Sequence, residues 1–242
     1  MAATAFLISL AAFVGGIVQA STGFGMAIVL MALWPLVMPV ADAVILTPFV
    51  SAIAVFSIAI RQRRHLNFSL VALPGAISAL IMLLSFNLML HSDSAFILRI
   101  LGGVLILLSA YFFFFAERIS LPAGPLAASL AGLLSGVLGG MFSISGPPMA
   151  LYYSVAIRDK DEYLATLQTF FAINLLVKIL YSLFFVDLPL AVLPAVPFAI
   201  GACFLGMLVG NLIFRKLNSS LIKKAVYAAM MLSGLWFVLD KA

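Results

Sequence analysis

Charge is scarce in this 242-residue sequence, because only 9% of its residues are Asp, Glu, Lys or Arg, against about 25% in a soluble domain. Hydrophobic residues make up 65% of the chain, and the mean hydropathy is +1.27. There are too few polar residues to cover a globular core of this size. The composition therefore excludes a soluble enzyme, a disordered chain and a nucleic-acid-binding protein.

Metal-binding and redox-active residues are scarce as well. The single cysteine, Cys203, excludes an internal disulfide, a thiolate metal cluster and a CxxC redox pair. The two histidines, His65 and His91, are not at metal-ligand spacing. No Walker A sequence is present, so ATP-driven transport would need a separate subunit. We predict no metal site and no cofactor.

Carboxylates are missing from the middle of every long apolar run. A carboxylate proton relay or a carboxylate sodium site is therefore hard to build inside a membrane, although a sodium site made of backbone carbonyls stays open. The lack of a His, Asp or Glu cluster in the apolar runs also argues against catalysis. We predict that the chain is not an enzyme and has no catalytic residues.

Long apolar runs dominate what is present. They are unbroken rather than alternating, so they indicate membrane helices and exclude the strands of an outer-membrane barrel. We predict an all-α polytopic membrane helix bundle. Its ten helical segments are expected at residues 4–19, 24–38, 43–60, 68–90, 95–115, 125–140, 146–157, 162–186, 189–214 and 219–239.

Four of these segments are too short for the hydrocarbon core, which needs about 20 helical residues. They form two pairs, 4–19 with 24–38 and 125–140 with 146–157, each interrupted by Gly, Ser or Pro. The pattern predicts two inverted repeats, at residues 1–116 and 125–242, joined by a cytoplasmic connector at 117–124. Each repeat would hold a broken, re-entrant helix pair and three transmembrane helices. Full crossing by the short segments is the alternative.

The basic residues predict the orientation. In the re-entrant topology, ten of the 13 Lys and Arg residues lie on one face, which the positive-inside rule makes cytoplasmic. Full crossing by the short segments gives the same loop sides. Both termini would then lie on the outer side of the inner (plasma) membrane of the cell. The ten residues are Arg61, Arg63, Arg64, Arg118, Arg158, Lys160, Arg215, Lys216, Lys223 and Lys224.

The helix breaks are the candidate site. Broken helices paired across an inverted repeat point to a transporter site near the bilayer midplane. The second half-helix of each pair has free N–H groups at its N-terminus, which favour an anion. Gly23 and Gly25 precede one such N-terminus, Gly146 and Pro147 begin the other, and nearby hydroxyls come from Ser21, Thr22, Ser143 and Ser145. The alternative is that the glycines only allow close helix packing.

The predicted helix at 162–186 carries the most intramembrane polarity. Asn174 and Lys178 are four residues apart and share a face. Lys178 is a candidate counter-charge for an anion, or it snorkels to the interface. Asn174 either contacts the ligand or joins two helices. In the first half, Thr47, Pro48 and Ser51 occupy the equivalent helix and would supply milder polar contacts or a kink.

Two motifs resemble one family. The segment Gly132-Leu-Leu-Ser135-Gly136-Val-Leu-Gly139-Gly140-Met-Phe-Ser-Ile-Ser145-Gly146-Pro147-Pro148 and the segment Gln19-Ala-Ser-Thr22-Gly23-Phe24-Gly25 are similar to the signatures of the sulfite exporter TauE/SafE family, which includes toluene sulfonate uptake permease-like transporters. The resemblance extends over nearly the whole chain. Phe142 and Ser143 depart from it, because a Thr-Gly pair is common there.

The resemblance implies a membrane transporter of small sulfur-containing anions. With the argument from the helix breaks it gives a substrate-binding set of Gln19, Ser21, Thr22, Gly23, Phe24, Gly25, Ser143, Ser145, Gly146, Pro147, Asn174 and Lys178. We predict a secondary transporter that moves sulfite or an organosulfonate such as sulfoacetate by alternating access. The alternatives are a passive anion channel with the same site and a membrane-embedded enzyme or assembly factor. The expected partners are the anion and the lipid bilayer but no nucleic acid, and the sequence leaves a coupling ion and a homo-oligomer open.

Overall fold

The computed structural model describes residues 2–114, 124–213 and 219–239, and within these ranges every regular element is a helix. Three short 3-10 helices accompany the α-helices, at Trp34–Leu36, Arg63–His65 and Leu193–Ala195. The α-helices are α1 (Ala2–Thr22), α2 (Met26–Leu33), α3 (Val40–Gln62), α4 (Phe68–Leu90), α5 (Ser94–Phe114), α6 (Pro125–Phe142), α7 (Gly146–Ala156), α8 (Lys160–Phe185), α9 (Val196–Ile213) and α10 (Ser219–Leu239).

The ten helices lie where the apolar runs predict them, but several lengths differ: the segment predicted at 24–38 is the 8-residue α2 followed by the 3-10 helix Trp34–Leu36. The segments predicted at 4–19 and 125–140 are helices of 21 and 18 residues, long and apolar enough to cross a membrane. The prediction of two short helices per pair is therefore wrong for α1 and α6. Only α2 and α7, with 8 and 11 residues, are half-helices.

One helix start was also predicted wrongly. The chain at residues 189–192 forms a turn in which the Pro189 carbonyl accepts bonds from the Val192 and Leu193 amides. The helix α9 begins only at Val196. Most of the predicted connector, residues 117–123, lies outside the described residues.

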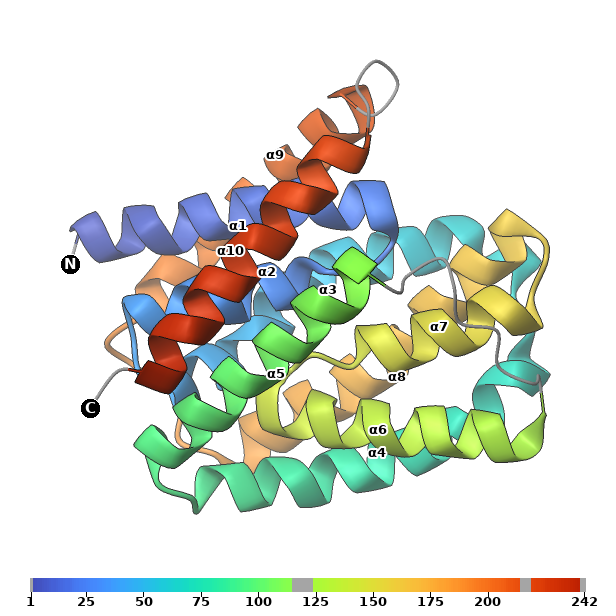
Figure 1. The fold of residues 1–242 in the computed structure, drawn as a ribbon, viewed down its shortest axis with the longest axis horizontal. Helices are drawn as coiled ribbons and strands as arrows, with labels where there is room; N and C mark the ends of the chain where they lie inside the picture. The colour runs from blue at the N-terminus through green and yellow to red at the C-terminus, as the bar shows by residue number, and fades with distance from the viewer. Residues whose placement is uncertain (1, 115–123, 214–218, 240–242) are drawn as a thin grey trace.

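Helix packing joins the two halves of the chain. Helix α1 packs along α9, α4 along α6, α5 along α10 and α3 along α8. Figure 1 shows α4 and α6 side by side along one edge and the α5–α10 pair crossing diagonally in front. At two of these contacts, glycine lets the helix backbones approach each other closely. A Cβ added to Gly16 would lie 2.3 Å from the Cys203 carbonyl oxygen, and a Cβ added to Gly140 would lie 2.4 Å from the Met82 carbonyl oxygen.

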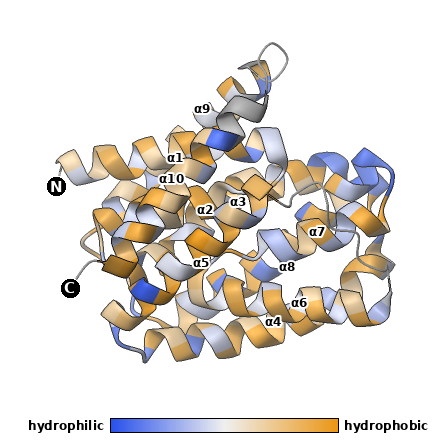
Figure 2. Ribbon diagram, viewed as in Figure 1, coloured by the Kyte–Doolittle hydropathy of each residue, from blue (hydrophilic) through white to orange (hydrophobic). Residues whose placement is uncertain are grey.

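The surface is that of a multi-pass integral membrane protein. Seven helices in the described ranges are long and apolar enough to span a bilayer, and large hydrophobic side chains such as Leu107, Phe184 and Leu212 are exposed. Figure 2 shows hydrophobic residues along the helices and hydrophilic ones gathered mainly towards the ends of the bundle.

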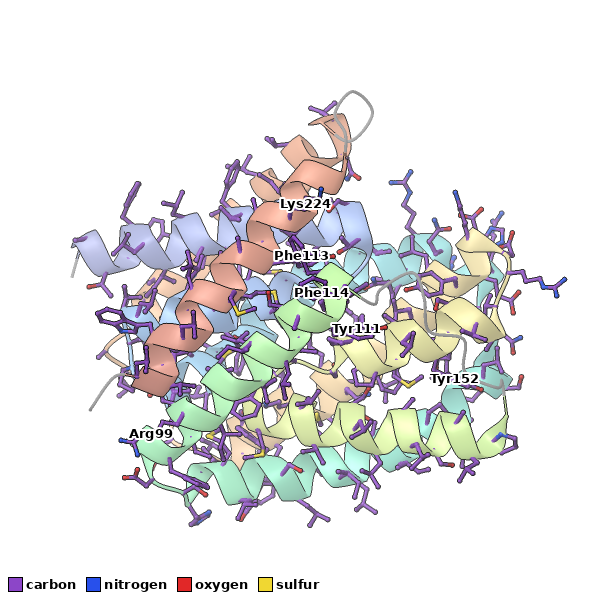
Figure 3. The ribbon with its side chains drawn as sticks, viewed as in Figure 1. Arg99, Tyr111, Phe113, Phe114, Tyr152 and Lys224 are labelled. Carbon is purple, nitrogen blue, oxygen red and sulfur yellow. The ribbon has the colours of Figure 1, made fainter. Side chains whose placement is uncertain are left out.

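The ends of the bundle differ in the loops they carry. Both chain termini are drawn at the same end of the bundle (Figure 1). The loop after α3 meets the start of α8, because Asn67 Nδ2 donates to Glu162 Oε1 at 2.8 Å. Figure 3 places Arg99 and Lys224 at opposite ends of the α5–α10 pair. These positions agree with the predicted sides of the loops, and the assignment of one side to the cytoplasm stays a prediction.

Candidate functional site

The first helix break, between α1 and α2, is stabilised by a buried amide. Gln19 Nε2 donates to the Gly23 carbonyl at 3.1 Å, and Gln19 Oε1 accepts from the Met26 amide at 3.3 Å. Gln168 of α8 also donates to the Gly23 carbonyl. Gly23 and Gly25 have φ values of 75° and 109°, which side chains rarely adopt. Glycine therefore allows the chain to reverse here, and α2 packs back against α1.

The second break, between α6 and α7, uses serine at the corresponding turn. Ser143 adopts a left-handed conformation with φ 58°, which glycine adopts more readily than serine. The Ser143 amide donates to the Gly139 carbonyl at 3.0 Å, and the Ile144 amide donates to that of Leu138 at 3.1 Å. These two bonds close α6 as a helix C-cap. The chain then enters α7 at Gly146.

A cavity of about 70 Å³ lies between the two breaks. Its walls come from α1, α2, α3, α4, α6, α7, α8 and both breaks. It is small beside the roughly 300–1,000 Å³ of sites for drug-sized ligands. The lining residues are Gln19, Phe24, Gly25, Met26, Ala27, Ile28, Thr47, Pro48, Ser51, Val55, Met82, Gly139, Ser143, Ile144, Ser145, Gly146, Phe171, Asn174, Leu175 and Lys178.

Two helix N-termini present unused donors to this cavity. The amides of Ala27 and Ile28, in the first turn of α2, have no hydrogen-bond partner among the described residues. At α7 the same holds for the amides of Ser145 and Gly146 and for the Ser145 hydroxyl. The next two residues of α7 are prolines without an N–H. Each N-terminus therefore offers its free donors next to the cavity, with the positive end of the helix dipole behind them.

Ser51 of α3 is a further unused polar group. It lines the cavity, is only 6% exposed, and its hydroxyl has no hydrogen-bond partner within the described part of the chain. A buried hydroxyl without a partner carries a desolvation cost of about 1–3 kcal/mol. Such a group at the wall of a cavity points to a polar ligand.

Lys178 lies inside the protein and does not snorkel. Its side chain is 2% exposed, and its ammonium donates to the carbonyls of Gly139 at 2.7 Å and Gly140 at 3.0 Å and to Ser143 Oγ at 2.8 Å. The Phe86 ring lies 4.4 Å away. No carboxylate of the described residues pairs with it. All three hydrogen-bond positions of Lys178 Nζ are used, so Lys178 offers no free donor to the cavity.

A proline explains how Ser143 reaches α3. Pro48 lies inside α3 and has no N–H, which leaves the Val44 carbonyl without its helical partner. Ser143 Oγ donates to this carbonyl at 2.9 Å and accepts from Lys178. One hydroxyl thus joins α3, the second break and α8.

The remaining polar side chains of the cavity hold helices together. Asn174 donates to the Phe170 carbonyl at 2.9 Å and accepts from Ser78 Oγ of α4 at 2.9 Å. Thr47 donates to the Ala43 carbonyl of its own helix at 2.7 Å, and its hydroxyl also contacts Met31 Sδ of α2 at 3.7 Å. Asn174 therefore joins α8 to α4 while it also lines the cavity, and one of its amide hydrogens stays available.

The structure brings together eight of the twelve predicted site residues in the cavity wall: Gln19, Phe24, Gly25, Ser143, Ser145, Gly146, Asn174 and Lys178. The other four lie in the breaks but do not line it. Ser21 and Thr22 donate to the Val18 carbonyl, Gly23 carries the carbonyl bonded by the two glutamines, and Pro147 is buried in the first turn of α7.

The apolar lining residues were not predicted. Met82, Phe171, Leu175 and Val55 form part of the wall, and nothing in an apolar run separates such residues from those that face lipid. Ser51, Thr47 and Pro48 could be found from the sequence, as polar or helix-breaking residues in an apolar segment. Among the described residues, no cluster of three or more His, Cys, Asp or Glu could hold a metal ion.

Comparison with known proteins gave one result. The family model described as sulfite exporter TauE/SafE matches residues 8–237. The curated proteins gave no match, and the solved structures gave none.

Proposed function

Because the chain belongs to the sulfite exporter TauE/SafE family, we propose that it is a secondary transporter that binds a small sulfur-containing anion in the cavity between the two helix breaks. Membership indicates a membrane transporter of sulfite or related sulfur anions rather than an enzyme. The anion, the site and the transport mechanism are our proposals.

One observation carries the assignment of the site. The free amides at the N-termini of α2 and α7 meet a single cavity, together with the unpartnered Ser51 hydroxyl and the buried Lys178 side chain. Every unused lining group named above donates hydrogen bonds, and anions bind at helix N-termini for this reason. An oxyanion would accept from both helices and from the hydroxyls, while Lys178 attracts it through space.

The size and chemistry of the cavity favour sulfite over larger sulfonates. A volume of about 70 Å³ suits an anion of a few heavy atoms. No carboxylate is among the lining residues, so the ammonium group of an aminosulfonate would find no charged partner and would be buried at a cost. We expect sulfite to bind more tightly than sulfoacetate, and aminoethanesulfonate to bind least.

Alternating access follows if the two repeats, 1–116 and 125–242, move against each other around this cavity. The helix pairs support the proposed inverted repeat. Exchanging each helix for its counterpart, α1 for α6 and α4 for α9, turns the α1–α9 pair into the α6–α4 pair, and both pairs are extensive. The pairs α3–α8 and α5–α10 join counterparts directly. We place the basic loop after α3 in the cytoplasm and the protein in the inner membrane.

Counterflow in proteoliposomes tests the proposal. Liposomes preloaded with unlabelled sulfite should accumulate labelled sulfite transiently, saturably and with competition by the unlabelled anion. In a passive pore, anion on the opposite side would not stimulate uptake of the labelled anion. The absence of transport for every sulfur anion tested would contradict the assignment. Repeating the assay with and without sodium or a proton gradient would identify a coupling ion.

A further inference from the structure

Phe24 is the one bulky side chain at the tip of the first helix break. It lies between Gly23 and Gly25, which take left-handed φ values, and Thr22 holds its backbone on both sides. The Phe24 amide donates to Thr22 Oγ1 at 3.3 Å, and Thr22 Oγ1, whose proton bonds the Val18 carbonyl, also lies against the Phe24 carbonyl. The backbone is therefore held in place, and the ring position is set by what it packs against.

The Phe24 ring lies across the N-terminus of α7. A Cβ placed on Gly146 would lie 3.3 Å from Phe24 Cδ2 and 3.7 Å from Phe171 Cζ. Both aromatic residues also line the cavity. The first helix break thus contributes an aromatic wall directly beside the free amides of the second one.

On its other side, Phe24 packs against the α5–α10 pair. Its ring centroid lies 5.8 Å from that of Phe112 on α5. Phe112 stacks on Tyr227 of α10, with centroids 5.3 Å apart and planes 10° apart. Ser109 donates to the Tyr227 carbonyl at 2.7 Å, which holds the two helices together at this level. The Phe24 ring thus contacts both the cavity and the aromatic pair on α5 and α10, and neither ring of that pair lines the cavity.

We propose that Phe24 is the size filter of the cavity: its ring, held against Phe112, closes the cavity towards α5 and α10 and limits it to small anions. The selectivity part of this proposal rests on the proposed transport function. Its barrier part rests only on the packing of the ring.

The selectivity test compares uptake of sulfite and sulfoacetate by proteoliposomes. Phe24→Ala should raise the ratio of sulfoacetate to sulfite uptake by about tenfold or more, the scale on which a hydrophobic pocket discriminates by size, and Phe24→Leu should fall between. Phe113→Ala is the matched control, because this neighbouring ring of α5 is 57% exposed and does not line the cavity; Figure 3 shows it near the end of α5. An unchanged ratio in Phe24→Ala would overturn the proposal.

A labelling test does not depend on transport. In a Cys203→Ala background, Ser145→Cys places a thiol in the cavity wall, and its reaction with an anionic methanethiosulfonate reagent reports access. Adding Phe24→Ala, or Phe112→Ala where the first variant fails to fold, should raise the labelling rate, whereas Phe113→Ala should not. Equal rates in all variants would show that Phe24 is no barrier. If the wild-type protein transports neither anion, the proposed function fails, and this test still decides the role of Phe24.

Discussion

The Ser51 hydroxyl allows stability and anion affinity to be separated in one substitution. Without a ligand this hydroxyl is buried and has no partner in the described residues, so its desolvation costs about 1–3 kcal/mol. Ser51→Ala removes that cost but leaves a small void, which takes back part of the gain. We expect the free energy of unfolding to rise by about 1 kcal/mol, seen as a melting temperature about 2–4 °C higher.

The same substitution should weaken anion binding. A hydrogen bond to a charged group contributes about 1.5–3 kcal/mol, which corresponds to a dissociation constant about 10–150 times larger. Sulfite binding to the purified protein, measured by calorimetry beside a thermal melt, gives both quantities. A variant that is more stable and binds more weakly is the outcome that an unpaired group reserved for the ligand requires.

Ser135 and Ser182 provide matched controls. Their hydroxyls are also buried without partners in the described residues, but neither residue lines the cavity. Ser135→Ala and Ser182→Ala should therefore change stability as Ser51→Ala does and leave sulfite affinity unchanged. An unchanged dissociation constant in Ser51→Ala, or an equal loss of affinity in all three variants, would refute the reasoning.

Three further predictions concern packing, charge and orientation. Gly146→Ala should weaken sulfite binding, because its methyl group would lie 3.3 Å from Phe24 Cδ2 and displace that ring at the cavity wall, whereas Gly103→Ala, which has open space around it, should not. Lys178→Met should lower the melting temperature more than Lys178→Arg, because the Gly140 carbonyl loses its hydrogen-bond donor at a cost of about 1–3 kcal/mol. It should also lower sulfite affinity more, because the positive charge is lost. Equal effects of the two substitutions would show that the charge does not contribute. In a Cys203→Ala background, Arg63→Cys should react with an impermeant thiol reagent only from the cytoplasmic side, and labelling from outside intact cells would reverse the orientation.

The sequence predicted the helices well because the bilayer leaves the backbone few choices. An apolar run must form a helix that satisfies its own N–H and C=O groups. The Gly-rich and Pro-rich breaks before α2 and α7 could be found because those residues interrupt such runs.

The lengths of α1 and α6 were missed at their C-terminal ends, because Ser21, Thr22, Met141 and Phe142 were assigned to the breaks and lie in the helices. Gly16, Gly136 and Gly140 lie inside the predicted helices. In the structure they are helical positions that touch neighbouring backbone, since a Cβ on Gly136 would lie 2.8 Å from the Ser78 carbonyl oxygen. Glycine in a membrane helix often serves this close approach, and the sequence does not show which use applies.

The site was predicted where its chemistry is local and missed where it depends on packing. Free amides follow from a break and a helix start, so Ser145 and Gly146 could be named. The bond from Ser143 to the Val44 carbonyl joins residues 99 positions apart. No spacing within one segment predicts this bond. The same is true of the hydrogen bonds from Lys178 to the carbonyls at the end of α6.

Sulfite binding to the double variant Ser51→Ala/Ser145→Ala tests the central claim most directly. These two hydroxyls come from α3 and from the start of α7, both line the cavity, and neither has a partner in the described residues. If the anion binds between the helix breaks, the double variant should fold and melt like the wild type or slightly higher, and should bind sulfite at least about 100-fold more weakly. A folded double variant that binds sulfite with the affinity of the wild type would place the anion elsewhere and contradict the account.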